Sequence, residues 1–166
     1  PIPGIKPMFG LLPLACGCAL DDITVATMTR PGYPTPADWC DYHIRVTHYP
    51  LPLNSQNQFR FSTADIESGT DLVMTNYPHN PSGQIATEAW WRALCEHCSD
   101  NDIRLFNDAA YYSLSHTEES ATLAEVGELD VVHVVGGLDD LDQPRLGRVD
   151  RQREVFNGDG LFVFGK

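Results

Sequence analysis

The stretches NYPHNPSG, at residues 76–83, and IRLFNDAAYYSL, at residues 103–114, decide which fold this sequence predicts. Each contains the end of a short β-rich run, DLVMTN at 71–76 and IRLFN at 103–107, followed by turn-forming or polar residues. In an open parallel sheet, ligands bind beyond the carboxyl ends of the strands, where the connecting loops converge. Side chains that follow the two runs are therefore expected to meet at one edge of a sheet.

A helix is predicted between the two runs, from about Glu88 to Ser99. Thr87 is placed to cap its first turn, and the DND of residues 100–102 breaks the helix before the next strand. A single crossover of this kind makes the two strands parallel neighbours. The fold class is therefore predicted to be α/β, with a mostly parallel sheet flanked by helices. Further strands are predicted at 23–29, 42–49 and 131–135.

The rest of the chain carries weaker signals. A second helix is predicted from Met8 to Leu20, although Pro13 would kink or shorten it. Residues 50–70 are predicted to be irregular. Residues 1–135 are expected to form one sheet domain, and residues 136–166 are expected to be an irregular, mostly polar tail.

The composition restricts the classes of partner. A chain of 166 residues is long enough for one domain with a hydrophobic core. Its 23 acidic and 11 basic residues give a net charge of −12, which would repel nucleic acid and anionic lipid. No apolar run has the length of a membrane span, and the opening residues PIPGIKPMFG lack the features of a secretory signal. We therefore expect a cytoplasmic protein that binds neither nucleic acid nor membranes.

The five cysteines leave two alternatives, a zinc site or reduced thiols in the core. Cys95 and Cys98 have a spacing that can hold zinc, but the other close pair, Cys16 and Cys18, is separated by a single residue. Cys95 also belongs to an apolar stripe that includes Trp91, which is the spacing of a buried helix face. Core packing is therefore favoured, and no metal ligand is assigned.

The NPSG and DAAY motifs together resemble the cofactor-binding segments of class I/II aminotransferases, which have fold type I and use pyridoxal 5'-phosphate. The resemblance spans most of residues 4–135 and implies part of the large domain of such an enzyme. It implies that Asn80 and Tyr111 donate hydrogen bonds to the phenolic oxygen of the cofactor. Asp108 would face the pyridine nitrogen, where a carboxylate keeps the ring protonated and able to withdraw electrons.

Two further segments extend the resemblance. PGYP, at residues 31–34, is similar to the family segment whose aromatic residue stacks on the cofactor ring, which implies this role for Tyr33. RLGR, at residues 145–148, is similar to the segment that binds the cofactor phosphate, which implies this role for Arg145. Counting back from RLGR places Gly137 where the family has its catalytic lysine.

The sequence does not supply that lysine at the expected position, because its two lysines are Lys6 and Lys166. In the family the lysine bonds to the cofactor aldehyde and then moves the substrate proton. The resemblance implies transfer of an amino group from an amino acid to a 2-oxo acid by a homo-oligomer. We expect a truncated chain, impaired or inactive in isolation, and leave the catalytic residue unassigned. The alternative is a non-catalytic domain that binds the cofactor or another protein.

Overall fold

A parallel sheet forms the centre of the computed structural model, which describes residues 5–117, 119–126, 133–135 and 161–163. The sheet has four strands in the order β2-β1-β3-β4, and all three pairings between neighbours are parallel. This arrangement confirms the predicted fold class. The strands are β1 (Ile23–Thr27), β2 (Val46–Pro50), β3 (Leu72–Asn76) and β4 (Arg104–Asp108).

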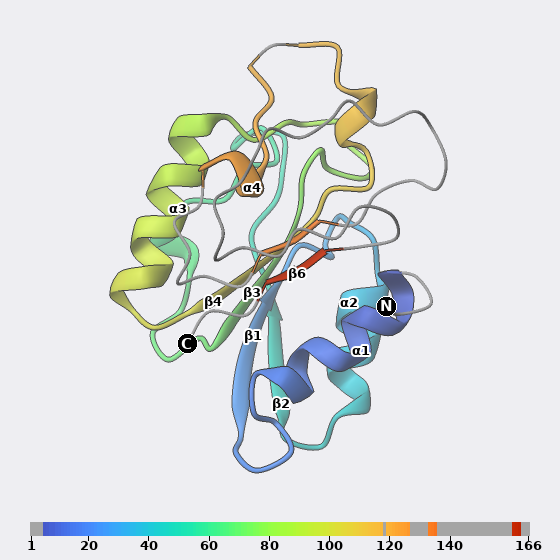
Figure 1. The fold of residues 1–166 in the computed structure, drawn as a ribbon, viewed down its shortest axis with the longest axis vertical. Helices are drawn as coiled ribbons and strands as arrows, with labels where there is room; N and C mark the ends of the chain where they lie inside the picture. The colour runs from blue at the N-terminus through green and yellow to red at the C-terminus, as the bar shows by residue number, and fades with distance from the viewer. Residues whose placement is uncertain (1–4, 118, 127–132, 136–160, 164–166) are drawn as a thin grey trace.

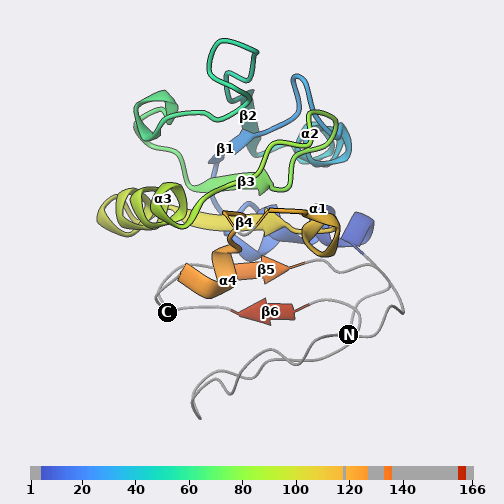
Figure 2. The same ribbon diagram turned by 90° about the horizontal axis from the view of Figure 1, so that it is seen from above.

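Helices cover both faces of this sheet (Figure 1, Figure 2). α1 and α2 lie on one face, and α3 and α4 lie on the other. Two short strands, β5 and β6, form an antiparallel pair, and β5 lies beside β4 on the side away from β3 (Figure 2). The bounds are α1 (Ile5–Ala15), α2 (Thr35–Tyr42), α3 (Glu88–Asp100), α4 (Leu123–Val126), β5 (His133–Val135) and β6 (Leu161–Val163), with short 3-10 turns at Thr63–Asp65 and Tyr112–Leu114.

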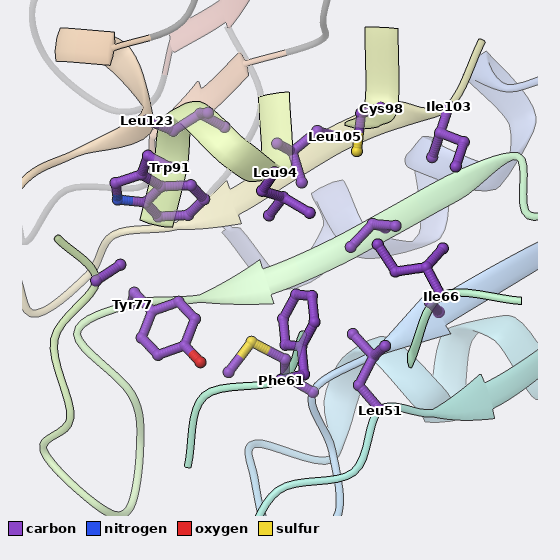
Figure 3. Packing of buried hydrophobic residues seen from close by; sticks show 14 of the residues in the cluster. Leu51, Phe61, Ile66, Tyr77, Trp91, Leu94, Cys98, Ile103, Leu105 and Leu123 are labelled. Carbon is purple, nitrogen blue, oxygen red and sulfur yellow. The ribbon is translucent and has the colours of Figure 1, made fainter. Parts of the chain in front are cut away.

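The larger hydrophobic core lies between the sheet and α3. Figure 3 shows Trp91 and Leu94 of α3 close to Leu105 of β4 and to Tyr77, which follows β3. Trp91 and Leu94 are at most 1% exposed, and Cys98 continues the same helical stripe. This packing confirms the prediction that the stripe is a buried helix face, with Cys98 inside the core and Cys95 packed against it.

A second core lies between the sheet and α1. Phe9 packs its ring edge-on against Phe106 of β4, with the ring centroids 5.4 Å apart. α1 and α2 approach each other closely at Gly10, where an added Cβ would lie 2.8 Å from Cε3 of Trp39. Because successive side chains of a strand alternate between faces, β3 supplies both cores and all five of its residues are buried.

The predicted helix after Thr87 is confirmed. α3 begins at Glu88, and Oγ1 of Thr87 accepts a hydrogen bond from the backbone N–H of Trp90 at 3.3 Å. The strands predicted at 23–29, 71–76 and 103–107 are also found, within two residues of the predicted ends. The strand predicted at 131–135 is described only at 133–135, as β5.

Two predicted boundaries were wrong. The first helix spans Ile5–Ala15 instead of Met8 to Leu20, because Gly17 adopts a φ of 102° and turns the chain. Pro13 lies in the last turn of this helix and does not break it.

The strand predicted at 42–49 begins only at Val46, because α2 occupies the chain through Tyr42. Helix α2 was not predicted, although its early proline and the acidic Asp38 in its first turn are features of a helix start. None of the helices in the described ranges combines the length and apolar character that crossing a bilayer requires.

Candidate functional site

The carboxyl ends of β3 and β4 lie side by side, because Asn76 pairs with Asp108 in the sheet register. Nδ2 of Asn76 donates a hydrogen bond to the backbone oxygen of Asp108 at 2.9 Å. Oδ1 of Asn76 accepts one from the backbone N–H of Asn80, also at 2.9 Å. The buried amide of Asn76 therefore ties the turn that carries Asn80 to the end of β4.

Asn80 and Tyr111 meet across this edge of the sheet. Nδ2 of Asn80 lies 3.4 Å from the hydroxyl oxygen of Tyr111, which is a long hydrogen bond between side chains 31 positions apart. Both residues line a cavity of about 580 Å³ at the edge of the sheet. The two polar groups can therefore reach a common ligand atom. The cavity is lined by Pro78, His79, Asn80, Pro81, Gly83, Ile85, Tyr111, Leu114, Ser115, His116 and Thr117.

Asp108 is the buried acid of the site, with only 5% of its surface exposed. Its Oδ1 accepts a hydrogen bond from the backbone N–H of Ala110 at 3.1 Å. Burial raises the pKa of the Asp108 carboxyl, and the hydrogen bond from Ala110 opposes this shift. Within the described ranges the carboxylate forms no ion pair, so its charge is suited to a cationic group of a ligand.

Tyr33 lies on the α1 side of the sheet, where it and Asp108 line the same small cavity of about 10 Å³. The ring of Phe9 also borders this cavity, and its centroid lies 6.2 Å from that of Tyr33. The bend before Tyr33 requires a glycine, since a Cβ at Gly32 would collide with the backbone oxygen of Met28.

The structure therefore places the four described candidates at one edge of the sheet, in two separate groups. Asn80 and Tyr111 share one cavity, and Tyr33 and Asp108 share the other. The link between the groups, Asn76, was missed by the sequence reasoning. The signal available for it was an amide residue at the last position of the predicted strand 71–76, where a side chain can bridge to the neighbouring strand end.

The remaining residues that the sequence singled out contribute no further contact to this site in the described ranges. Arg145, Gly137 and Lys166 lie outside the described residues. Lys6 is exposed on α1. Among the described residues, no group of three or more histidine, cysteine, aspartate or glutamate side chains is placed to hold a metal ion. All five cysteines are free, and burial raises the pKa of the Cys98 thiol to about 12.

Comparison with known proteins gives a consistent result. The family model described as aminotransferase class I and II matches residues 2–138. The LL-diaminopimelate aminotransferase of Methanocaldococcus jannaschii is 29% identical over 114 residues, which cover 66% of this chain and 27% of that protein. Transaminase BacF of Bacillus subtilis is 26% identical over 120 residues, which cover 69% of this chain and 30% of that protein.

Solved structures show the same fold. The substrate-bound structure of BacF from Bacillus subtilis matches with a TM-score of 0.65 and 24% identity, covering 80% of this chain and 34% of that chain. The L,L-diaminopimelate aminotransferase from Chlamydomonas reinhardtii matches with a TM-score of 0.65 and 21% identity, over 80% of this chain and 34% of that chain. The chain thus spans about a third or less of the length of these relatives.

Proposed function

Because the chain belongs to the class I and II aminotransferase family, we propose that it holds the ring of pyridoxal 5'-phosphate at the carboxyl edge of its sheet. The whole protein would transfer an amino group from an amino acid to a 2-oxo acid. The observation that carries this proposal is the 3.4 Å approach of the Asn80 amide to the Tyr111 hydroxyl, at the edge of the sheet where β4 ends in the buried Asp108.

The chemistry of these side chains fits the cofactor. An amide N–H and a phenol O–H that converge suit an oxygen carrying negative charge, as the phenolic oxygen of the cofactor does. A buried carboxylate that forms no ion pair within the described ranges suits a protonated ring nitrogen. The donors and the acid come from neighbouring strand ends, at the same edge of the sheet.

Each candidate residue of the site would then have a defined role. Pyridoxal phosphate, when bound, supplies an electron sink for the bond that breaks at the substrate α-carbon. Asp108 would hold a proton on the ring nitrogen, and Asn80 and Tyr111 would hold the phenolic oxygen by hydrogen bonds. Tyr33 would pack on the ring and exclude water from it, and Arg145 would bind the phosphate.

A second candidate function is a non-catalytic domain that binds the cofactor without a covalent link. The observation that favours it is the lack of a lysine at the expected catalytic position, which Gly137 occupies. Lys6 is exposed on α1. Borohydride reduction separates the two candidates, because it fixes the cofactor to the protein only where a lysine has bonded to the aldehyde. The variant Gly137→Lys should increase that fixation, because it restores an amine at the position expected for the catalytic lysine.

Cofactor binding is tested by titrating the chain with pyridoxal phosphate and following its absorbance. Tyr111→Phe removes one hydroxyl and should weaken binding about five- to tenfold, the equivalent of one hydrogen bond. Tyr42→Phe is the matched control, because Tyr42 is 80% exposed. Absence of saturable binding by the unaltered chain, or equal affinities for the two variants, would refute the proposed site.

We also propose that the protein works in the cytoplasm as a homo-oligomer. The free state of all five cysteines suits a reducing compartment. Large apolar side chains are exposed at Leu11, Leu14 and Ile44, which favours association with a second chain. Sedimentation that shows a monomer at all concentrations would contradict the oligomer.

A further inference from the structure

We propose that His79 is a positioning residue, which fixes the turn carrying Asn80 against the segment carrying Tyr33. This inference rests on the proposed function, because its purpose is to hold two cofactor contacts in one arrangement. His79 is 2% exposed. Its Nδ1 lies 2.7 Å from Oγ of Ser82, and its Nε2 lies 3.2 Å from the backbone oxygen of Pro31.

The partners of His79 determine how its ring is protonated. A backbone oxygen can only accept, so Nε2 carries the hydrogen and donates it to Pro31. In the neutral ring Nδ1 then accepts from the hydroxyl of Ser82, and Oγ of Ser82 accepts in turn from the backbone N–H of Gln84 at 3.2 Å. Burial lowers the pKa of His79, which favours this neutral form.

A third segment holds the ring in place. Phe59 stacks against His79, with the ring centroids 6.1 Å apart and the planes inclined by 27°. The hydroxyl of Tyr77 donates to the backbone oxygen of Phe59 at 2.7 Å, which joins this segment to the end of β3. The imidazole is therefore fixed by packing as well as by hydrogen bonds, and its two nitrogens keep their directions.

The contact with Pro31 spans 48 positions of the chain and reaches the bend two residues before Tyr33. The contact with Ser82 closes the turn two residues after Asn80. A single side chain thus connects one loop of each cavity. If the connection is broken, Asn80 and Tyr33 should remain present but lose their fixed separation, and a ligand that needs both should bind less tightly.

The first test compares pyridoxal phosphate binding by His79→Phe and by the control variant His97→Phe. His97 lies in the last turn of α3. His79→Phe keeps an aromatic ring on Phe59 and loses both hydrogen bonds, so its affinity should fall about tenfold. His97→Phe should bind as the unaltered chain does. His79→Gln, which returns an amide N–H toward Pro31, should recover part of the loss.

The second test repeats His79→Phe in an Asn80→Ala background. If His79 acts by placing Asn80, its loss should weaken binding less than about threefold once Asn80 is gone, because effects of coupled residues do not add. An equal factor in both backgrounds would show a merely structural role and overturn the inference.

Hydrogen exchange shows whether the variant remains folded. We expect faster exchange in His79→Phe only around residues 29–34 and 79–85, with the sheet unchanged. Faster exchange throughout, or none in these two segments, would overturn the positioning role. If the unaltered chain does not bind pyridoxal phosphate, the proposed function fails and this inference with it. If it binds and His79→Phe binds equally well, the inference alone fails.

Discussion

Replacing Asp108 by asparagine should make the cofactor-free protein more stable while weakening its hold on the cofactor. The carboxyl of Asp108 is 5% exposed, accepts one hydrogen bond from Ala110, and forms no ion pair among the described residues. Its pKa is raised because burial disfavours the charged form. Asparagine has nearly the same shape and can still accept the hydrogen bond from Ala110, but it carries no charge.

The size and the pH dependence of the effect follow from this environment. A buried group that lacks its partners costs about 1–3 kcal/mol, and a charged group costs more than a neutral one. Removing the charge should therefore stabilise the protein by about 1–3 kcal/mol, a rise in melting temperature of about 3–9 °C for Asp108→Asn at pH 7. Because the folded-state pKa is raised, the folded protein keeps a proton on Asp108 that the unfolded chain has already released. The contribution of Asp108 to stability is therefore present below the unfolded pKa and is lost as the pH rises through the folded pKa.

The assay is thermal unfolding followed by circular dichroism. The pH series runs from about pH 3, roughly one unit below the ordinary carboxyl pKa, to about pH 8. The two melting curves should coincide at the acid end and diverge as the pH rises. Asp22→Asn, at an exposed position before β1, should show no such divergence. Equal or lower stability of Asp108→Asn at pH 7 would refute the reasoning.

Added pyridoxal phosphate should reverse the order of stability. A ligand at about 100 times its dissociation constant stabilises the folded state by about 2.7 kcal/mol. The unaltered protein should gain this stabilisation, because the carboxylate of Asp108 would pair with the ring nitrogen, and Asp108→Asn should gain much less. An equal gain for both proteins would mean that Asp108 does not face the cofactor.

Two further predictions concern the packing that supports the site. Leu94→Ala should lower the free energy of unfolding by about 2–5 kcal/mol in urea denaturation, because Leu94 is 1% exposed between α3 and the sheet, whereas Leu20→Ala, at a 78% exposed position, should change it by less than about 0.5 kcal/mol. Gly10→Ala should lower stability by about 1–3 kcal/mol, because its Cβ would lie 2.8 Å from Trp39, and the same change should be neutral or stabilising beside Trp39→Phe. A stabilising Gly10→Ala in the unaltered protein would contradict the close contact of α1 and α2.

Patterns along the chain predicted the sheet better than they predicted the helices around it. The apolar runs before Asn80 and Asp108, separated by one helical segment, were sufficient to predict two parallel neighbours with polar groups at one edge. Helix α2 was missed because its eight residues have little apolar periodicity, with Pro36 and Cys40 as its only buried positions. The first helix was misplaced because the turn at Gly17 depends on a backbone conformation that the pattern does not specify.

The sequence by itself determined that Asn80, Asp108 and Tyr111 would lie at or just beyond the ends of parallel strands, because hydrophobic periodicity and turn residues act over a few positions and set the direction of each segment. Only the tertiary structure decided how those loops are held. Three contacts join residues 24 to 48 positions apart: Asn76 with Asp108, Phe9 with Tyr33, and His79 with Pro31. Contacts at such separations depend on strand register and on how the helices pack on the sheet, and no short stretch of sequence encodes either.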